Sequence, residues 1–400
     1  MDDRLPYARA HCFMAGVGDA GEALCGANMQ FGLAKIHVVQ ERLGFPADAT
    51  FVGAPDATVT RNRPRWNAGF GYGGRIRWSG DFAVLDEKPN ACGMLVGALA
   101  GLPAEAEMRT RAREVAAHGV TLDGVRLDFD IDESNHFVDL CEVADDPFGR
   151  VPTGAIFVMH SSGHEHRGPT ERGPGLYHDK SPELARMAER HDTPWGPLSI
   201  LRGDALRAWF EFVLRVQAFG LRRREALARA LFGEFTVVQN AMHQGLQAPN
   251  DVNIGCYVFD DAAATDGSLF PLTLSADLPI SLVRPKPNLS DEVLGRVDWA
   301  ERAHRHGVLD RVRRANLLPH GGGYSYAQFR GVAEARHRGP DDRTFLLEPA
   351  GGGPAVEVDD VRGLAHGYRG AEVLQRAVAL GLCEPVVTLD VRYVVRTAAA

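Results

Sequence analysis

The sequence predicts an α+β protein with irregular mixed sheets and flanking helices. Segments with helical spacing of apolar residues and segments with strand-like alternation follow one another without the regular strand–helix–strand order of a doubly wound sheet. The composition, with 45% hydrophobic and 24% charged residues, is ordinary for a globular protein. A chain of 400 residues is also long enough to bury a sizeable core.

The expected elements are given in chain order. Residues 66–84 contain glycine-rich turns and short strands, residues 104–118 an exposed helix, residues 136–143 a half-buried strand and residues 154–160 a fully buried strand. Apolar side chains at helical spacing predict one long helix over residues 203–232, or two helices broken near Gly220. Residues 245–300 are expected to be loop-rich with patches of strand. A helix at 371–380 and a strand at 386–395 close the chain.

Charge, apolar runs and cysteines limit the class of protein. The formal net charge of −8 argues against a binder of polyanions over its whole surface, but it allows a local basic groove. No apolar run approaches the roughly 20 residues of a membrane helix, and the charged N-terminus lacks the apolar core of a signal peptide. The six cysteines show no C-x-x-C spacing, so we expect them reduced and mostly buried. Together these features predict a cytoplasmic protein without membrane partners.

One thiol and three histidines stand at the boundaries of expected elements. His160 ends a buried strand, and a Ser/Gly turn with His164, His166 and Arg167 follows it. Cys92, His136 and His243 occupy comparable positions elsewhere in the chain. Thiolate and imidazole ligands suit a borderline transition metal, with Zn²⁺ or Mn²⁺ as candidates. No two of the four are close in sequence, so each also fits a structural role, as a strand-ending histidine or a buried thiol.

A glycine-rich stretch, Gly16 to Gly21, raises a nucleotide-binding alternative. It fits G-x-G-x-x-G, and Glu41 lies twenty residues further on, in the spacing of a dinucleotide-binding fold. The residues before Glu41, KIHVVQ, are a plausible strand. Gly26 and Gly32 make the intervening segment poor for a helix, so the sequence favours a simple glycine-rich turn.

Several short motifs occur in a fixed order from about residue 50 to the C-terminus. They are Pro55–Thr58, Pro89–Gly93 around Cys92, Ser134-Asn135-His136-Phe137, His160-Ser161-Ser162-Gly163, His243, Pro319–Gly323 and the closing strand at 386–397. This ordered set resembles the RtcB-type RNA ligases, or tRNA-splicing ligases. That family joins an RNA 3′-phosphate or 2′,3′-cyclic phosphate to a 5′-hydroxyl.

The resemblance implies a fold, a metal site and partners. It implies one RtcB-like domain over residues 1–400, with residues 1–50 as a divergent N-terminal segment. It implies Mn²⁺, with Zn²⁺ or Fe²⁺ as alternatives, on Cys92, His136, His160 and His243. The implied substrate or nucleotide contacts are Asn135, Asp56, Arg167 and Arg396. An RNA end or a small phosphorylated molecule would be the partner.

The chain departs from the family at the residues that handle GTP. Ala350 stands where the family carries its guanylylated histidine, and alanine cannot attack a phosphate, so GTP-dependent ligation is not expected. Should a covalent guanylate form nonetheless, the histidines to examine are His320, His337 and His366. The remaining departures are Pro354 for an arginine, Arg396 for a lysine, Thr397 for a glycine, Thr58 for a histidine and Pro89 for a metal-binding aspartate. Asp86 or Glu87 is a candidate replacement for that aspartate.

The sequence therefore predicts a metal-dependent RtcB-like enzyme that acts on a phosphate ester or an RNA terminus. Two alternatives remain open: a non-catalytic RtcB-like binding or regulatory protein, and a metalloenzyme repurposed for a small molecule other than RNA. No G-x-x-x-x-G-K-[ST] phosphate loop and no K-x-D-G ligase motif is present. Arginine groups at 61/63/65, 222/223/224 and 311/313/314 would suit phosphates, but solvated faces are the favoured interpretation. Arg223 also matches a family asparagine that contacts the nucleotide.

Overall fold

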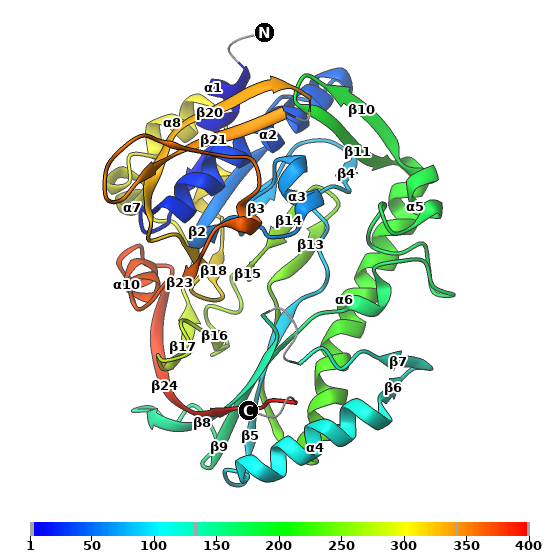
Figure 1. Cartoon of the computed structure of the whole chain (residues 1–400), viewed down its shortest axis with the longest axis vertical. Helices are drawn as coiled ribbons and strands as arrows, with labels where there is room; N and C mark the ends of the chain where they lie inside the picture. The colour runs from blue at the N-terminus through cyan, green and yellow to red at the C-terminus, as the bar shows by residue number, and fades with distance from the viewer. Residues whose placement is uncertain (1–3, 132–134, 341, 398–400) are drawn as a thin grey trace.

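Two β-sheets and one long helix form the frame of the protein (Figure 1). The computed structural model describes residues 4–131, 135–340 and 342–397, so Ser134 of the S-N-H-F motif lies outside the described residues. Helices and strands are mixed, as the sequence predicts. In Figure 1 the five-stranded sheet lies in the upper half, the seven-stranded sheet in the lower half, and α6 (Gly203–Phe232) runs alongside both.

The seven-stranded sheet carries most of the candidate ligands. Its order is β12 (Thr236–Met242), β5 (Gly93–Leu99), β9 (Ala155–Ser161), β8 (Phe137–Asp145), β24 (Cys383–Val394), β17 (Ile280–Pro285) and β16 (Phe270–Leu272). All neighbouring strands are antiparallel. The register pairs Gly93 with Ser161 and Phe137 with His160. The start of β5, the end of β9 and the start of β8 therefore meet at one end of the sheet.

From this end of the seven-stranded sheet, the chain passes into a five-stranded sheet. Its order is β1 (Cys12–Met14), β2 (Thr50–Thr58), β3 (Tyr72–Arg77), β14 (Asp251–Ile254) and β13 (Gln244–Ala248). His243 is the single residue between β12 of the large sheet and β13 of the small one. It is held there because its backbone N–H donates to Cys92 O and its own carbonyl accepts from Gly255 and Cys256.

The expectation of a poor helix after Gly21 is wrong. A 23-residue helix, α2 (Ala20–Arg42), connects β1 to the parallel strand β2, and KIHVVQ belongs to this helix rather than to a strand. Gly32 is needed for packing, since a Cβ there would lie 2.6 Å from Gly69 O. Tertiary burial of nearly the whole helix outweighs the low helix propensity of its glycines.

The long helix α6 is unbroken at Gly220. A Cβ at Gly220 would lie 3.2 Å from atoms of Ala91, so this glycine allows the loop before Cys92 to approach the helix. The expectation of solvated faces for the arginine groups is wrong for Arg223 and Arg224, which are fully buried, and for Arg65, which is 4% exposed. Arg65 donates to the carbonyls of Glu87 and Lys88 and so ties down the same loop.

Smaller elements complete the described part of the chain. The other helices are α1 (Arg4–Ala10), α3 (Arg63–Ala68), α4 (Glu105–His118), α5 (Pro182–Met187), α7 (Asp291–Arg296), α8 (Ala300–Arg305), α9 (Leu309–Arg313), α10 (Glu372–Ala379) and the 3-10 turns η1 (His164–His166) and η2 (Val361–Gly363). The other strands are β4 (Phe82–Val84), β6 (Val120–Leu122), β7 (Val125–Leu127), β10 (Glu189–Thr193), β11 (Gly196–Arg202), β15 (Cys256–Val258), β18 (Leu317–Pro319), β19 (Tyr324–Ser325), β20 (Phe329–Gly339), β21 (Asp342–Pro349), β22 (Val356–Val358) and β23 (Gly367–Tyr368).

Burial agrees with one further expectation. The six cysteines are all buried and free within the described residues. Across residues 4–131, 135–340 and 342–397, no helix combines the length and the apolar character that crossing a membrane would require.

Candidate metal centre

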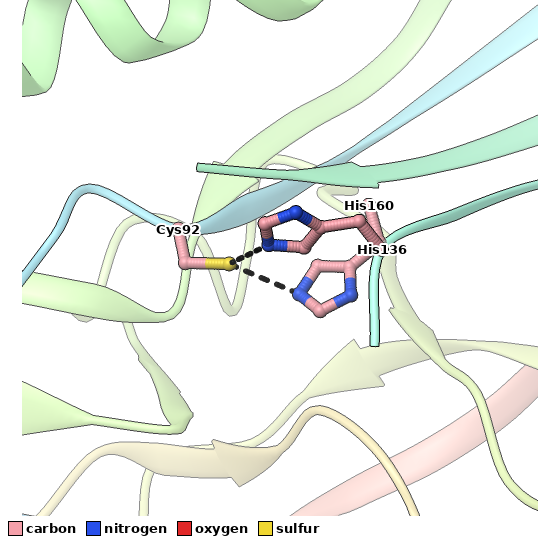
Figure 2. A group of neighbouring side chains, drawn as sticks. All are labelled: Cys92, His136 and His160. Carbon is pink, nitrogen blue, oxygen red and sulfur yellow. Dashed lines mark hydrogen bonds between the residues drawn. The ribbon is translucent and has the colours of Figure 1, made fainter. Parts of the chain in front are cut away.

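Three side chains converge where β5, β9 and β8 meet. Cys92 directly precedes β5, His160 lies in β9 and His136 directly precedes β8. Cys92 Sγ lies 3.1 Å from His160 Nε2 and 3.7 Å from His136 Nε2, and Figure 2 shows both rings pointing at the sulfur. All three residues are at most 5% exposed. A fourth donor joins them from the sheet junction, since His243 Nε2 lies 3.1 Å from His160 Nε2.

Backbone and side-chain contacts orient these imidazoles. His160 Nδ1 donates to Asn135 O at 2.7 Å, so in the neutral ring the Nε2 lone pair faces the cluster. His136 Nδ1 lies 2.8 Å from the Asp130 carboxylate, although this contact is off the line of the N–H bond. His243 Nδ1 is buried and has no hydrogen-bond partner among the described residues. Three Nε2 atoms and one sulfur therefore share a small buried volume.

The electrostatics of the cluster favour a bound cation. Burial alone would raise the pKa of Cys92, but His160, His243 and His136 outweigh it and hold that pKa well below its ordinary value. Burial alone would lower the pKa of His136, but Asp130 and Cys92 raise it to about 10. Burial and the neighbouring His320 lower the pKa of His243 well below its ordinary value. The cluster thus contains a thiolate beside one protonated ring, that of His136, whose proton a metal ion would replace.

The spacing of three of the donors, Cys92, His136 and His160, suits a metal ion, because their ligand atoms all lie within 4.8 Å of one another. Donor atoms around a tetrahedral zinc with bonds of about 2.0–2.3 Å lie roughly 3.3–3.8 Å apart. The Cys92–His136 separation of 3.7 Å lies in that range, and the Cys92–His160 and His160–His243 separations of 3.1 Å lie just below it. The residues present therefore fit a metal, and a mixed thiolate and imidazole set is compatible with Zn²⁺, Fe²⁺ or Mn²⁺.

The carboxylate beside His136 is one that the sequence did not single out. Asp86 accepts from Ser199 N at 2.7 Å and lies 3.7 Å from His178, so it does not replace the aspartate lost at Pro89. Glu87 is fully buried, and neither of its carboxylate oxygens has a partner within the described part of the chain. Asp130 takes the place beside His136 instead. Asp130 belongs to an acidic run, and its spacing from His136 carries no motif that would have marked it.

A cavity of about 670 Å³ opens beside the cluster. His136 and His160 line it, as do three of the expected contact residues, Asn135, Arg167 and Arg396. Arg61 and Lys180 also line the cavity and add positive charge to it. The excess of cationic side chains makes this cavity suitable for an anionic group such as a phosphate.

Asp56 is placed differently from the expectation that it contacts substrate. It is fully buried and is not part of the cavity wall. Its carboxylate accepts from the backbone N–H groups of His320 and Gly321, at 3.0 and 3.2 Å, and lies 2.8 Å from His320 Nδ1. Asp56 therefore supports the loop that carries His320. That imidazole does line the cavity, and its ring centroid is 4.2 Å from that of His243.

Aromatic side chains form part of the cavity rim. The ring centroids of Tyr324 and Tyr368 lie 5.5 Å apart, and the guanidinium of Arg61 lies 5.9 Å from the centroid of Tyr324. All three residues line the cavity, and Tyr368 is 50% exposed. Rings and a guanidinium arranged in this way offer stacking surfaces for a planar group such as a nucleobase.

Three residues of the GTP comparison, Ala350, His337 and His366, lie outside the cavity wall. Ala350 is exposed in the turn after β21. His337 packs against Phe31, and His366 Nδ1 lies 3.1 Å from Arg61 Nη1. Of the three alternative histidines, only His320 lines the cavity.

Comparison of the sequence with family models and with curated proteins finds no relative. No family model matches the sequence, and no curated protein matches it.

Proposed function

We propose that this chain is a metal-dependent RtcB-like enzyme that acts on a phosphate ester or an RNA terminus. One observation carries the proposal: a buried cluster of one thiol and three imidazoles lies beside a cavity with cationic walls. The first feature suits a transition metal and the second suits a phosphate. The order of the motifs along the chain supports the RtcB-like fold.

In this proposal Cys92, His136, His160 and His243 hold the metal. A bound metal supplies a Lewis acid that polarises a phosphoryl oxygen or lowers the pKa of a bound water. Arg167, Lys180 and Arg396, which also line the cavity, bind and orient the phosphate oxygens. The tyrosines at the rim accommodate a base next to that phosphate, which favours an RNA end over a bare phosphorylated metabolite.

The activity is tested on RNA with defined ends. Metal-loaded protein is incubated with an RNA ending in a 2′,3′-cyclic phosphate and with a second RNA bearing a 5′-hydroxyl, and the termini are resolved on a denaturing gel. The proposal expects a metal-dependent change at the terminal phosphate that Cys92→Ala abolishes. Cys383→Ala, which removes a buried thiol in β24, is the matched control and retains the activity. An unchanged RNA terminus with Mn²⁺, Zn²⁺ and Fe²⁺ would favour the binding-protein alternative.

GTP-dependent ligation is tested separately. Incubation with labelled GTP and Mn²⁺ is expected to give no covalent guanylate, because Ala350 has no nucleophile. A stable protein-bound guanylate would contradict this expectation, and loss of the label in His320→Ala would then place it on the only one of the three alternative histidines that lines the cavity.

A further inference from the structure

Behind His136, three charged side chains form a buried chain. His136 Nδ1 lies 2.8 Å from Asp130 Oδ2, and Asp130 Oδ1 lies 3.2 Å from Arg223 Nη2. Arg223 Nε donates in turn to Glu165 at 2.7 Å. The side chains of Asp130, Arg223 and Glu165 are at most 4% exposed. Burying a charge is costly, and buried charges persist in proteins when they are paired and hydrogen-bonded, as these are.

This chain has a second possible interpretation. Ligand atoms of Asp130, His136 and His164 lie within 4.8 Å of one another, so the three are also a candidate group for a second metal ion. Two features argue against that use. Both Asp130 oxygens are engaged, one by Arg223 and one by His136, and a metal at this carboxylate would lie beside a buried guanidinium. Two positive charges so close in a buried site repel strongly.

We propose that Asp130, held by Arg223, is a positioning residue that fixes His136 from behind, and that the centre binds one metal ion per chain. The proposal rests on the metal site of the proposed function. Asp130 Oδ2 lies 2.8 Å from Nδ1 of His136, on the side of the ring away from the cluster, and Nε2 faces Cys92. Histidines that bind metals commonly donate their other N–H to such an outer carboxylate. Arg223 fixes the carboxylate, and Glu165 balances the remaining charge.

The same arrangement accounts for one departure from the RtcB pattern. Arg223 stands where the family has an asparagine that contacts the nucleotide, and here its guanidinium faces Asp130 and Glu165 instead. Arg223 is fully buried and is not part of the cavity wall. Its role in this chain is therefore to hold the outer carboxylate.

The experiment measures the stoichiometry and affinity of Co²⁺ for the full-length, chelator-stripped protein, with the thiolate-to-cobalt absorption band as the signal from Cys92. Wild-type protein is expected to bind one equivalent. Asp130→Asn keeps one equivalent but binds it 10- to 100-fold more weakly, and Asp130→Glu recovers part of the loss. Asp128→Asn, an exposed change two residues away, is the matched control and leaves the affinity unchanged. His164→Gln leaves both stoichiometry and affinity unchanged.

Two results would overturn the proposal. One is a second equivalent in wild-type protein that disappears in His164→Gln, because that assigns Asp130 to a second metal. The other is an unaltered affinity in Asp130→Asn, because that removes the positioning role. Thermal unfolding of the metal-free variants shows whether they fold. If Asp130→Asn does not fold, the wild-type stoichiometry and His164→Gln still decide between one metal and two. A wild-type protein with no cobalt band and no bound metal contradicts the proposed function itself, a result distinct from the other two.

Discussion

The metal cluster and the glycine-rich loop after β1 differ in how their polar groups are satisfied. In the cluster, imidazole nitrogens face one another at 3.1 Å across a buried volume. In the loop, Gly16 N and Gly18 N both donate to the carboxylate of Glu22, at 2.9 and 2.6 Å. Asp19 caps α2 by accepting from Glu22 N, and it also pairs with the buried Arg369.

The difference shows why only one of these two sequence patterns remains a candidate site. The loop has the strand–turn–helix geometry of a nucleotide-binding motif, but its own carboxylate occupies the N–H groups that would bind a phosphate. Glu41, at the position for a ribose contact, pairs instead with Arg4. The cluster keeps ligand atoms directed at one another, which is stable when a cation or a proton lies between them.

The largest expected effect on metal affinity follows from removing a ligand that contacts two others in the cluster. Cys92→Ala deletes the thiolate that faces two imidazoles, and His160→Ala deletes the ring that contacts Cys92 and His243. We expect each variant to bind Zn²⁺ at least about 100-fold more weakly, as measured by competition with a chromophoric chelator. Wild-type affinity in Cys92→Ala would show that the thiol is only a buried core residue.

The pH dependence of metal binding gives the next effect. The pKa of His136 is about 10, so this ring is protonated at neutral pH and must lose its proton to bind a metal, whereas Cys92 is already a thiolate. Apparent affinity should therefore fall about tenfold for each pH unit below 10, which is roughly 100-fold between pH 9 and pH 7. Calorimetry in buffers of different ionisation enthalpy should record release of one proton. An affinity independent of pH over this range would contradict the thiolate–imidazolium assignment.

A smaller effect is expected in the glycine loop. Glu22→Gln removes the charged acceptor of two backbone N–H groups, so we expect the free energy of unfolding to fall by about 1–2 kcal/mol in urea denaturation. Metal affinity should not change, since Glu22 is not part of the cluster. A stable variant that gains saturable binding of a dinucleotide would show that the carboxylate had been blocking a real nucleotide site.

The smallest effect is expected next to the buried charge network. Arg222 adjoins Arg223 in α6 but is exposed and pairs with Asp123 at the surface. Arg222→Ala should change the free energy of unfolding by less than about 0.5 kcal/mol and leave metal affinity unaltered. A large loss of metal affinity in this variant would mean that the outer charges of α6, and not the Arg223–Asp130 pair alone, support the centre.

Local patterns in the sequence predicted the elements that hold the cluster, but not all of the side chains behind it. The alternation at 136–143 and the apolar run at 154–160 gave β8 and β9, and apolar spacing gave α6. The burial of Arg223 was missed, although the residue lies four positions after Phe219 and four before Leu227 on the apolar face. The place of Asp130 beside His136 could not be predicted, because Asp128 and Asp130 look alike until the chain has folded. The helix α2 was missed because its stability comes from packing that glycine permits.

An anomalous difference map from crystals grown with Mn²⁺ or Zn²⁺ tests the proposed metal centre directly. We expect one strong peak within bonding distance of Cys92 Sγ and of Nε2 of His136, His160 and His243. Electron density showing only a thiolate hydrogen-bonded to His160, with no peak among these four atoms, would contradict it.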